Sequence, residues 1–407
     1  MKLKDLSINI FSGGTPSTTN EDFWNGEFYW LSSGETKNTY IRETEKTITK
    51  LGIEKSSTRL AKVGDVVVAS AGQGKTRGQV AYCLTDTYIN QSIIAIRAKK
   101  DVLNSKYLFY NLSSRYNELR LLSDSSSSRG SLTVKIFEEL NIDLPEIEKQ
   151  NKIAKVLSNY DDLIENNNKR IKILEEMAQK IYKEWFVDFR FPGHETATFK
   201  QTELGDIPTN WEVANIEKYY NTSSGGTPSR KQLSYYDNGN INWIKTGELK
   251  NTFVIDTEEK ITEKAIKNSS AKVFPTNTVT LAMYCGMGDI SIMSKPMATN
   301  QACCVFLPKY DYLEYPFSYL FFCNITKEMI NISFGAAQQN LSQEVIKAYI
   351  VKFPNKEILL DFNKIIKPVF ENIKNLLYKN QTLKQMRDLL LPRLISGEID
   401  VENMGIK

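Results

Sequence analysis

The feature that most constrains this chain is a duplication. The hexapeptide SGGTPS occupies residues 12–17 and returns, letter for letter, at residues 224–229 of a 407-residue sequence. Downstream, YWLSSGETKNTYI (29–41) is matched by NWIKTGELKNTFVI (242–255). The copies start about half a chain length apart, whereas solenoid repeats span roughly 20–50 residues. The sequence therefore predicts two similar domains rather than a solenoid. Within each hexapeptide, Gly-Gly permits positive φ and Thr-Pro favours an extended or turn conformation.

The first part of each copy is expected to be a mixed α and β domain. Short β-branched runs bounded by Gly, Asn and Asp predict strands. These runs are GDVVVAS (64–70), GQVAYCL (78–84), QSIIAIR (91–97), NTVTLAM (277–283) and QACCVFL (301–307). Residues 105–122 and the segment from Tyr315 predict helices. The fold class expected for each domain is therefore α+β.

The second part of each copy carries an apolar heptad repeat. No glycine or proline interrupts Glu146–Phe189, which predicts one long helix. Pro368 lies inside the second run and predicts a kink or a helix restart. Matching seams predict that the two helices pack as a coiled coil, with one Asn in each seam to fix register. The alternative is a helix that packs on a globular core. The seam residues are Ile153, Leu157, Ile164, Asn167, Ile171, Leu174, Ile181, Ile366, Ile373, Leu376, Asn380, Leu383 and Leu390.

These patterns divide the chain into five segments. The predicted limits are a first domain at 1–145, a helical spacer at 146–190, a linker at 191–207, a second domain at 208–354 and a helical spacer at 355–407.

Few residues resemble an active site. ASAGQGKT (69–76) fits a loose P-loop, but a strand rather than a helix is predicted to follow it. A strand–turn–strand in which Lys75 and Arg77 face a phosphate fits the segment better. The single histidine, His194, excludes a histidine metal cluster and argues against a Ser-His-Asp site. No catalytic residue and no metal ligand are predicted.

Polar and basic loops remain as candidate binding elements. Taken alone, each is an ordinary solvated loop, but two similar modules on a stiff spacer suit two half-sites of a DNA duplex. The predicted DNA contacts are Thr15, Ser33, Lys37, Asn38, Gln73, Lys75, Arg77, Arg129, Lys135, Thr227, Arg230, Lys245, Thr246, Lys250, Asn251, Gln338, Gln339 and Asn340.

Composition limits how the chain can bind DNA and where it is located. The net charge is only +4, from 52 Lys and Arg against 48 Asp and Glu, so DNA binding has to use local patches. The five cysteines form no CxxC pair, which favours buried, reduced thiols over a disulfide framework. The N-terminal segment lacks the apolar core of a signal peptide. A cytoplasmic location is expected.

Together these features resemble the DNA-specificity subunit of type I restriction–modification enzymes. Besides the repeated motifs above, including Asn-Gln before an apolar strand, the resemblance rests on four segments. They are LPEIEKQNKIAKVL (144–157), KEWFVDFRFPG (183–193), TELGDIPTNWEV (202–213) and LLLPRLISGEI (389–399). The first copy lacks the IPTNWEV head of the second, and FPNKEILLDF (353–362) matches LPEIEKQNKI only loosely.

The resemblance implies two target-recognition domains joined by an antiparallel coiled coil. Each domain would bind one half of a split, asymmetric duplex target, and the helices would set the gap and dock two methyltransferase subunits. Restriction subunits would join through that complex. S-adenosylmethionine, ATP and Mg²⁺ would belong to these partners, so this chain is expected to carry no cofactor and to be non-catalytic.

Three alternatives stay open at this point. The chain is a specificity subunit for a fused methylase–nuclease, a P-loop nucleotide hydrolase, or a coiled-coil scaffold without a nucleic-acid role. The DNA sequence, the gap length and the base-contacting residues do not follow from the sequence.

Overall fold

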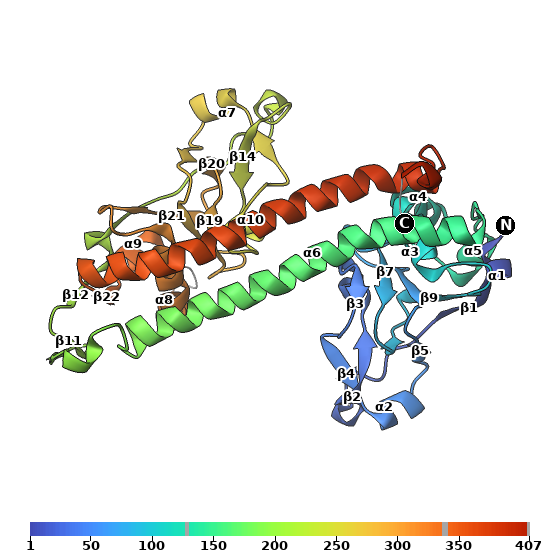
Figure 1. Cartoon of the computed structure of the whole chain (residues 1–407), viewed down its shortest axis with the longest axis horizontal. Coiled ribbons are helices and arrows are strands. Elements are labelled where there is room, and N and C mark those ends of the chain that lie inside the picture. Colours follow the sequence, from blue (N-terminus) through green and yellow to red (C-terminus); the bar gives the residue numbers. More distant parts are fainter. Residues whose placement is uncertain (127–129, 336–340, 405–407) are drawn as a thin grey trace. The chain divides into compact units, whose positions relative to one another are not determined.

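The chain forms two compact units, each containing one globular domain and segments of both long helices. The computed structural model describes residues 1–126, 130–335 and 341–404 (Figure 1). The first unit comprises Met1–Ile164 and Thr382–Lys407, and the second comprises Glu165–Gln381. Within the described ranges, no helix combines the length and the apolar character needed to cross a bilayer.

The first unit contains two sheets. The five-stranded sheet has the order β1-β9-β6-β7-β3 and the four-stranded sheet the order β4-β2-β8-β5. The strands are β1 (Ser7–Ser12), β2 (Trp24–Leu31), β3 (Tyr40–Ile41), β4 (Lys46–Ile48), β5 (Arg59–Ala61), β6 (Val66–Ala69), β7 (Val80–Cys83), β8 (Thr87–Ile89) and β9 (Ile93–Ala98). The helices are α1 (Leu3–Leu6), α2 (Lys50–Glu54), α3 (Ser105–Ser114), α4 (Tyr116–Ser126) and α5 (Val134–Glu139), with 3-10 turns η1 (Glu21–Phe23) and η2 (Ser33–Lys37).

Strand β6 shows why the apolar runs of this sequence are continuous rather than alternating. Val66 and Val68 belong to the core shared with Leu108 of α3. Val67 belongs to a second core shared with Leu31 and with Ile89 of the other sheet. Because both faces of the strand are covered, every position in it is apolar.

The second unit repeats this architecture. Its sheets have the orders β13-β21-β18-β19-β15 and β16-β14-β20-β17, with two further strand pairs, β10-β11 and β12-β22. The strands are β10 (Phe199–Thr202), β11 (Gly205–Pro208), β12 (Glu212–Asn215), β13 (Tyr220–Ser223), β14 (Ile241–Ile244), β15 (Phe253–Val254), β16 (Lys260–Ile261), β17 (Val273–Phe274), β18 (Val279–Ala282), β19 (Ile290–Met293), β20 (Met297–Thr299), β21 (Cys303–Pro308) and β22 (Ile350–Phe353). The helices are α7 (Glu263–Lys267), α8 (Tyr315–Gly335) and α9 (Gln343–Ala348); the 3-10 turns are η4 (His194–Thr196), η5 (Ile216–Lys218), η6 (Leu233–Tyr235) and η7 (Thr246–Glu248).

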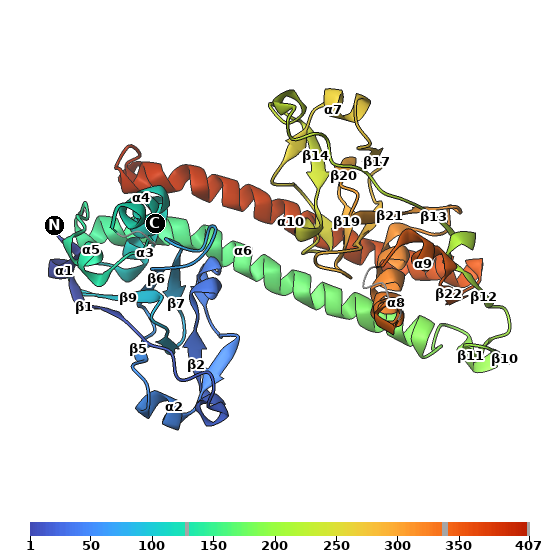
Figure 2. The ribbon, with the colours of Figure 1, turned by 180° about the vertical axis from the view of Figure 1, so that it is seen from behind.

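The duplication therefore extends to topology. The strand orders of the two units correspond one for one, including the parallel pairs β2·β8 and β14·β20. In each domain the four-stranded sheet and a short helix, α2 or α7, lie away from the long helices (Figures 1 and 2). The predicted α+β fold with a tandem repeat is confirmed.

The two long helices run antiparallel, as pairs within each unit show. They are α6 (Ile147–Tyr182), which continues as the π-helical turn η3 (Lys183–Val187), and α10 (Lys356–Ile395), followed by η8 (Val401–Met404). In the first unit Lys152 pairs with Glu402, and Asp161 with Arg387. In the second, Asn167 bonds Asn380 and the Tyr182 ring meets Phe362. As the residue number increases along α6, the residue number of its partner decreases, which is the pattern of antiparallel helices.

The seam is largely buried. Its members Ile153, Leu157, Ile164, Asn167, Ile171, Ile366, Ile373, Leu376 and Asn380 are buried, and Leu174, Ile181, Leu383 and Leu390 are partly buried. Pro368 does not restart the helix, since α10 is one element from Lys356 to Ile395. Its neighbours Ile366, Val369 and Phe370 are buried, and this packing offsets the loss of one backbone hydrogen bond.

Two sequence predictions are refined, and one alternative is wrong. Residues 105–122 form two helices, because α3 ends at Ser114 and α4 starts at Tyr116. All five cysteines are free thiols, but Cys285 is exposed and Cys323 is only partly buried. The P-loop alternative is wrong, because β6 and β7 pair antiparallel and no helix begins after 69–76.

Candidate nucleic-acid interface

The repeated hexapeptide makes the same close backbone contact in both domains. A Cβ atom on Gly13 would lie 1.9 Å from the carbonyl oxygen of Ile89, and one on Gly225 would lie 2.0 Å from that of Thr299. Neither glycine belongs to the positive-φ residues. The loop therefore requires the absence of a side chain, not the left-handed backbone that the sequence suggested.

A buried tryptophan holds each of these loops. The indole Nε1 of Trp30 donates to the carbonyl oxygen of Gly14 at 3.3 Å, and that of Trp243 donates to Gly226 at 3.1 Å. Both indoles are buried, so each finds its hydrogen-bond partner inside the protein.

A glutamate orders the turn that follows β2 and β14. Glu35 accepts hydrogen bonds from the backbone N–H groups of Ser32 and Glu45, at 3.1 and 2.9 Å. Glu248 accepts from Lys245 and Glu258 in the same way, at 2.8 and 2.7 Å. These bonds fix the turns that carry the repeated Lys-Asn dipeptides.

The topology brings four loops of each domain together where its two sheets adjoin. In the first domain Leu31 of β2 lies opposite Ile89 of the parallel strand β8. Ala69 of β6 lies opposite Ile93 at the start of β9. The loops that leave there are 12–17, 32–38, 70–79 and 90–92. The corresponding loops of the second domain are 224–229, 245–251, 283–289 and 300–302, placed by the equivalent strand pairs. We call each set a loop rim.

Two of the predicted lysines meet on the first loop rim. Lys37 and Lys75 line one open hollow of about 350 Å³ together with Thr36, Thr39, Gln79 and Tyr116. The Tyr116 hydroxyl donates to the carbonyl oxygen of Lys75 at 2.9 Å, which anchors that loop to α4. Ammonium and hydroxyl groups around an open hollow are suited to a phosphate.

Arg77 and Lys75 have different surroundings although they are two residues apart. The Arg77 guanidinium donates to the carbonyl oxygen of Gly130 at 2.8 Å and pairs with Asp124. Arg120 donates to the carbonyl oxygen of Gly74 at 2.8 Å. Both arginines therefore hold the loop in place, and Lys75 is the cation that the loop presents at the hollow.

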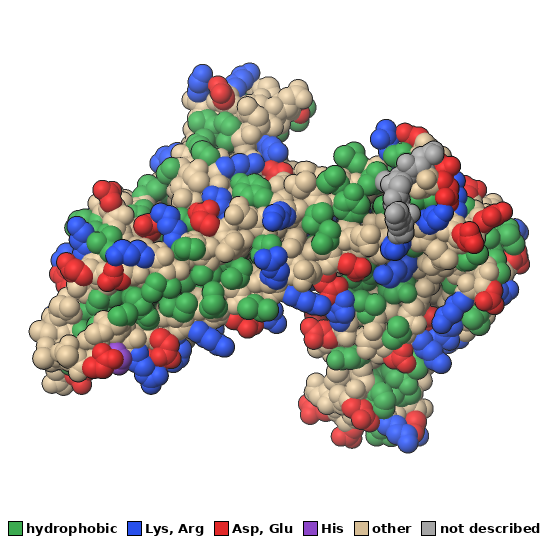
Figure 3. Space-filling model, viewed as in Figure 1, with side chains coloured by type: hydrophobic (Ala, Val, Ile, Leu, Met, Phe, Trp, Pro, Cys, Tyr) green, Lys and Arg blue, Asp and Glu red, His purple; other side chains and the backbone are tan. Residues whose placement is uncertain are grey.

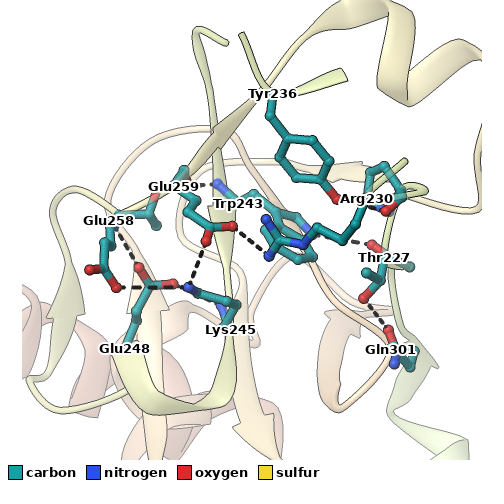
Figure 4. Close-up of polar contacts among 12 residues, drawn as sticks. Thr227, Arg230, Tyr236, Trp243, Lys245, Glu248, Glu258, Glu259 and Gln301 are labelled. Atoms are coloured by element: carbon teal, nitrogen blue, oxygen red, sulfur yellow. Dashed lines mark hydrogen bonds and ion pairs between the residues drawn. The ribbon is translucent and has the colours of Figure 1, made fainter. Parts of the chain in front are cut away.

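The cations on the second loop rim, and Arg230 directly beside it, are paired with carboxylates. Lys250 contacts Asp289 at 2.8 Å, and Asp289 occupies the place of Gln79 in the first domain. Figure 4 shows Arg230 and Lys245 on either side of Glu259, at 2.7 and 3.4 Å.

The Arg230 guanidinium is also stacked on aromatic rings. It lies 4.5 Å from the Tyr236 ring centre and 5.3 Å from that of Trp243 (Figure 4). Hydrogen bonding from Arg230 lowers the pKa of Glu259, and Lys245 adds to that shift. The bond to Glu259 likewise raises the pKa of Arg230. Arg230 and Glu259 thus stay charged and offset each other.

A threonine–glutamine hydrogen bond is repeated on both loop rims. Thr15 donates to Gln91, and Thr227 donates to Oε1 of Gln301 at 2.6 Å (Figure 4). Gln91 and Gln301 were not among the predicted contacts. The signal that points to them is the repetition of Asn-Gln at equivalent places in the two copies.

The other predicted contacts are dispersed. Asn38, Gln73 and Asn251 are exposed on the loop rims, Ser33 is partly buried in η2, and Lys135 is exposed on α5. Thr246 is buried, unlike these exposed side chains. Arg129, Gln338, Gln339 and Asn340 lie outside the described residues. In the part of the chain that the structure describes, no three His, Cys, Asp or Glu side chains lie close enough together to hold a metal ion.

Comparisons with known proteins agree on one family. The model for the type I restriction modification DNA specificity domain matches residues 1–176 and again 208–385. The MjaIX specificity subunit of Methanocaldococcus jannaschii is 28% identical over 99% of this chain and 94% of its own length. The HindI specificity subunit of Haemophilus influenzae is 24% identical, over 83% and 87%.

A solved structure shares the fold. The S subunit of a type I restriction-modification system from M. genitalium superposes with a TM-score of 0.59 at 15% identity, over 97% of this chain and 95% of that one. Because the family model covers most of the sequence in two separate copies, the chain belongs to the type I restriction modification DNA specificity family.

Proposed function

We propose that this chain is the non-catalytic DNA-specificity subunit of a type I restriction–modification system. Its two domains bind the two halves of a split, asymmetric duplex target. The observation that carries this proposal is the pair of loop rims, which two domains of the same topology build from the same Gly-Gly-Thr-Pro, Glu-capped and Thr-Gln elements. One rim for each half-site is the arrangement that a bipartite target requires.

The long helices supply a surface for the methyltransferase subunits. Outside their seam they expose large apolar side chains, and such side chains mark an interaction surface where they form a contiguous patch. These side chains are Leu163, Ile173, Met177, Leu360, Ile365, Met386 and Leu389. Figure 3 shows apolar side chains gathered along the helices on the face in view. Two methyltransferase subunits would dock there, and restriction subunits would join through them.

The chemistry would reside on these partners. S-adenosylmethionine, ATP and Mg²⁺ are proposed to bind the methyltransferase and restriction subunits, leaving sequence selection to this chain. Because the substrate is chromosomal and invading DNA, we place the assembly in the cytoplasm.

Methylome sequencing of a host with and without this chain tests the proposal. A split methylated motif is expected to vanish when the chain is deleted and to return with a plasmid copy. The complex with its methyltransferase should also bind duplex DNA with strong salt dependence. An unchanged methylome, together with no duplex binding by that complex, would contradict the proposal.

A further inference from the structure

The threonine–glutamine pairs leave one donor group of each glutamine unused. Oε1 of Gln91 accepts from Thr15, and Oε1 of Gln301 accepts from Thr227. Both glutamines are exposed. Within residues 1–126, 130–335 and 341–404, neither has a second side-chain hydrogen bond. Each amide nitrogen, with two N–H bonds, is therefore held in a fixed direction without a protein acceptor.

These exposed bonds are not what holds the hexapeptide loops in place. Gly14 N–H donates to the carbonyl oxygen of Ile89 at 3.1 Å, and Gly225 N–H donates to Oγ1 of Thr299 at 3.0 Å. The buried indoles of Trp30 and Trp243 bind the same loops. A further surface hydrogen bond adds little to a loop that buried contacts already fix.

The two loop rims have a shared part and an unshared part. The Thr-Gln pair is identical in both domains, whereas the hairpin loop beside it differs in length and in most of its side chains. In the first domain that loop carries Gln73, Lys75 and Arg77; in the second it carries Tyr284 and Met287. Two domains that select different half-sites need different residues for the bases. A residue pair that is the same in both domains and contacts DNA has to contact something that both half-sites present.

We propose that Gln91 and Gln301 each donate a hydrogen bond to a phosphate of the DNA backbone, with Thr15 and Thr227 as positioning residues. This inference rests on the function proposed above. With Oε1 engaged, each amide offers donors, and phosphate oxygens are acceptors that occur at every step of a duplex. The two contacts would set the register of each domain on DNA without favouring any base.

Substitution to glutamate separates this role from a purely structural one. A glutamate at position 91 keeps an oxygen that accepts from the Thr15 hydroxyl, but it replaces the N–H donors by negative charge. If Gln91 only tethers the loop, Gln91→Glu binds DNA like the wild type. If Gln91 donates to a phosphate, Gln91→Glu binds more weakly than Gln91→Ala.

The measurement is duplex affinity of the full chain assembled with its methyltransferase subunits. The probes are the cognate duplex and a set in which each recognised base pair is replaced in turn. Gln91→Ala and Gln301→Ala are each expected to weaken binding about tenfold, as for a hydrogen bond to a charged group. The factor should be the same for every duplex. The slope of log K against log salt should stay unchanged, because no charge is removed.

Thr15→Val and Gln201→Ala complete the set. Thr15→Val frees Gln91 from its fixed direction and should weaken binding by less than Gln91→Ala. Gln201 is an exposed glutamine of β10, outside both loop rims, and its alanine variant should bind normally. Thermal unfolding of each variant checks that the domains stay folded.

The outcomes separate the inference from the function on which it rests. A wild-type complex that binds no duplex overturns both. This inference alone is wrong if the wild type binds duplex DNA and both alanine variants bind it with wild-type affinity. It is also wrong if Gln91→Glu binds with wild-type affinity. A loss confined to one base pair also overturns it, because the glutamine would then contact a base.

Discussion

The Asn167 side chain donates a hydrogen bond to Oδ1 of Asn380 at 2.9 Å across the helix pair, and Asn380 in turn donates to Oδ1 of Asn168 at 2.8 Å. Asn167 and Asn380 are both buried in an otherwise apolar seam. A shift of either helix by one turn would bring each amide against apolar side chains and leave it unpaired. The pair therefore fixes the register in which the helices align.

Asn380→Leu is expected to lower the free energy of unfolding by about 1–3 kcal/mol, because it leaves the Asn167 amide buried without its partner. The double variant Asn167→Leu/Asn380→Leu should be more stable than either single variant. Urea unfolding of all four proteins gives the coupling energy. Asn166→Leu is the matched control, since Asn166 is exposed one residue away and should change stability by less than about 0.5 kcal/mol. If the two single changes in the free energy of unfolding simply add in the double variant, Asn167 and Asn380 are not energetically coupled.

Arg387→Met should destabilise the first unit by about 3–5 kcal/mol, because Asp161 would keep a buried charge without its cation. The Asp161 carboxylate pairs with Arg387 and accepts from the Tyr110 hydroxyl at 2.6 Å. Burial alone would lower the pKa of Arg387, but the nearby Asp161 raises it. Burial, reinforced by Asp161, raises the pKa of Tyr110, so this phenol stays a donor.

The control for this prediction removes the stranded charge. Asp161→Asn added to Arg387→Met leaves an oxygen that accepts from Tyr110. It should recover part of the lost free energy of unfolding, measured in urea. Lys384→Met, on an exposed side of α10, should be nearly neutral. If Arg387→Met lowers the free energy of unfolding no more than Lys384→Met does, the buried pair contributes nothing to stability.

The two loop rims should respond differently to loss of the equivalent lysine. Lys37→Ala is expected to reduce the slope of log K against log salt by about 1, as for one lost phosphate contact. Lys250→Ala should reduce it by less, because Asp289 already neutralises that ammonium group. Asp289→Gln, which introduces the residue of the first domain, should raise both affinity and slope. Equal slopes for all three variants and the wild type would show that Lys37 makes no phosphate contact and that Asp289 does not weaken one made by Lys250.

Gly225→Ala should damage the second domain alone. Its new methyl group would lie 2.0 Å from a carbonyl oxygen, and relieving such a clash costs about 1–3 kcal/mol. We expect lower stability in urea and loss of selectivity in one half-site only, measured with duplexes substituted in either half. Gly247→Ala meets no atom within 4 Å and serves as the control. Loss of selectivity in both half-sites would show that the domains are not independent.

Repetition and periodicity made most of the fold predictable. The duplicated motifs indicated two domains, and the heptad indicated paired helices with an Asn in each seam, because both signals lie along the chain. That Asn167 meets Asn380 is a property of two helices in space, but the pattern placed both residues at positions where such contact is possible.

The electrostatics of the site could not be predicted in the same way. Arg230 and Lys245 looked like free cations in the sequence, yet in the folded domain both contact Glu259, which lies directly before β16. The Gln91 side chain owes its direction to Thr15, 76 residues earlier. Contacts of this kind depend on the sheet topology, which no local spacing encodes.

The composition of the first unit has a consequence for biosynthesis. Its core includes Leu394 and Val401 beside Ile153 and Leu157, so its residues come from both ends of the chain. The second unit, by contrast, is one uninterrupted stretch, Glu165–Gln381. On the ribosome the domain that is translated first is thus the last to be completed, and it must keep its α6 surface open until the final turns of α10 emerge.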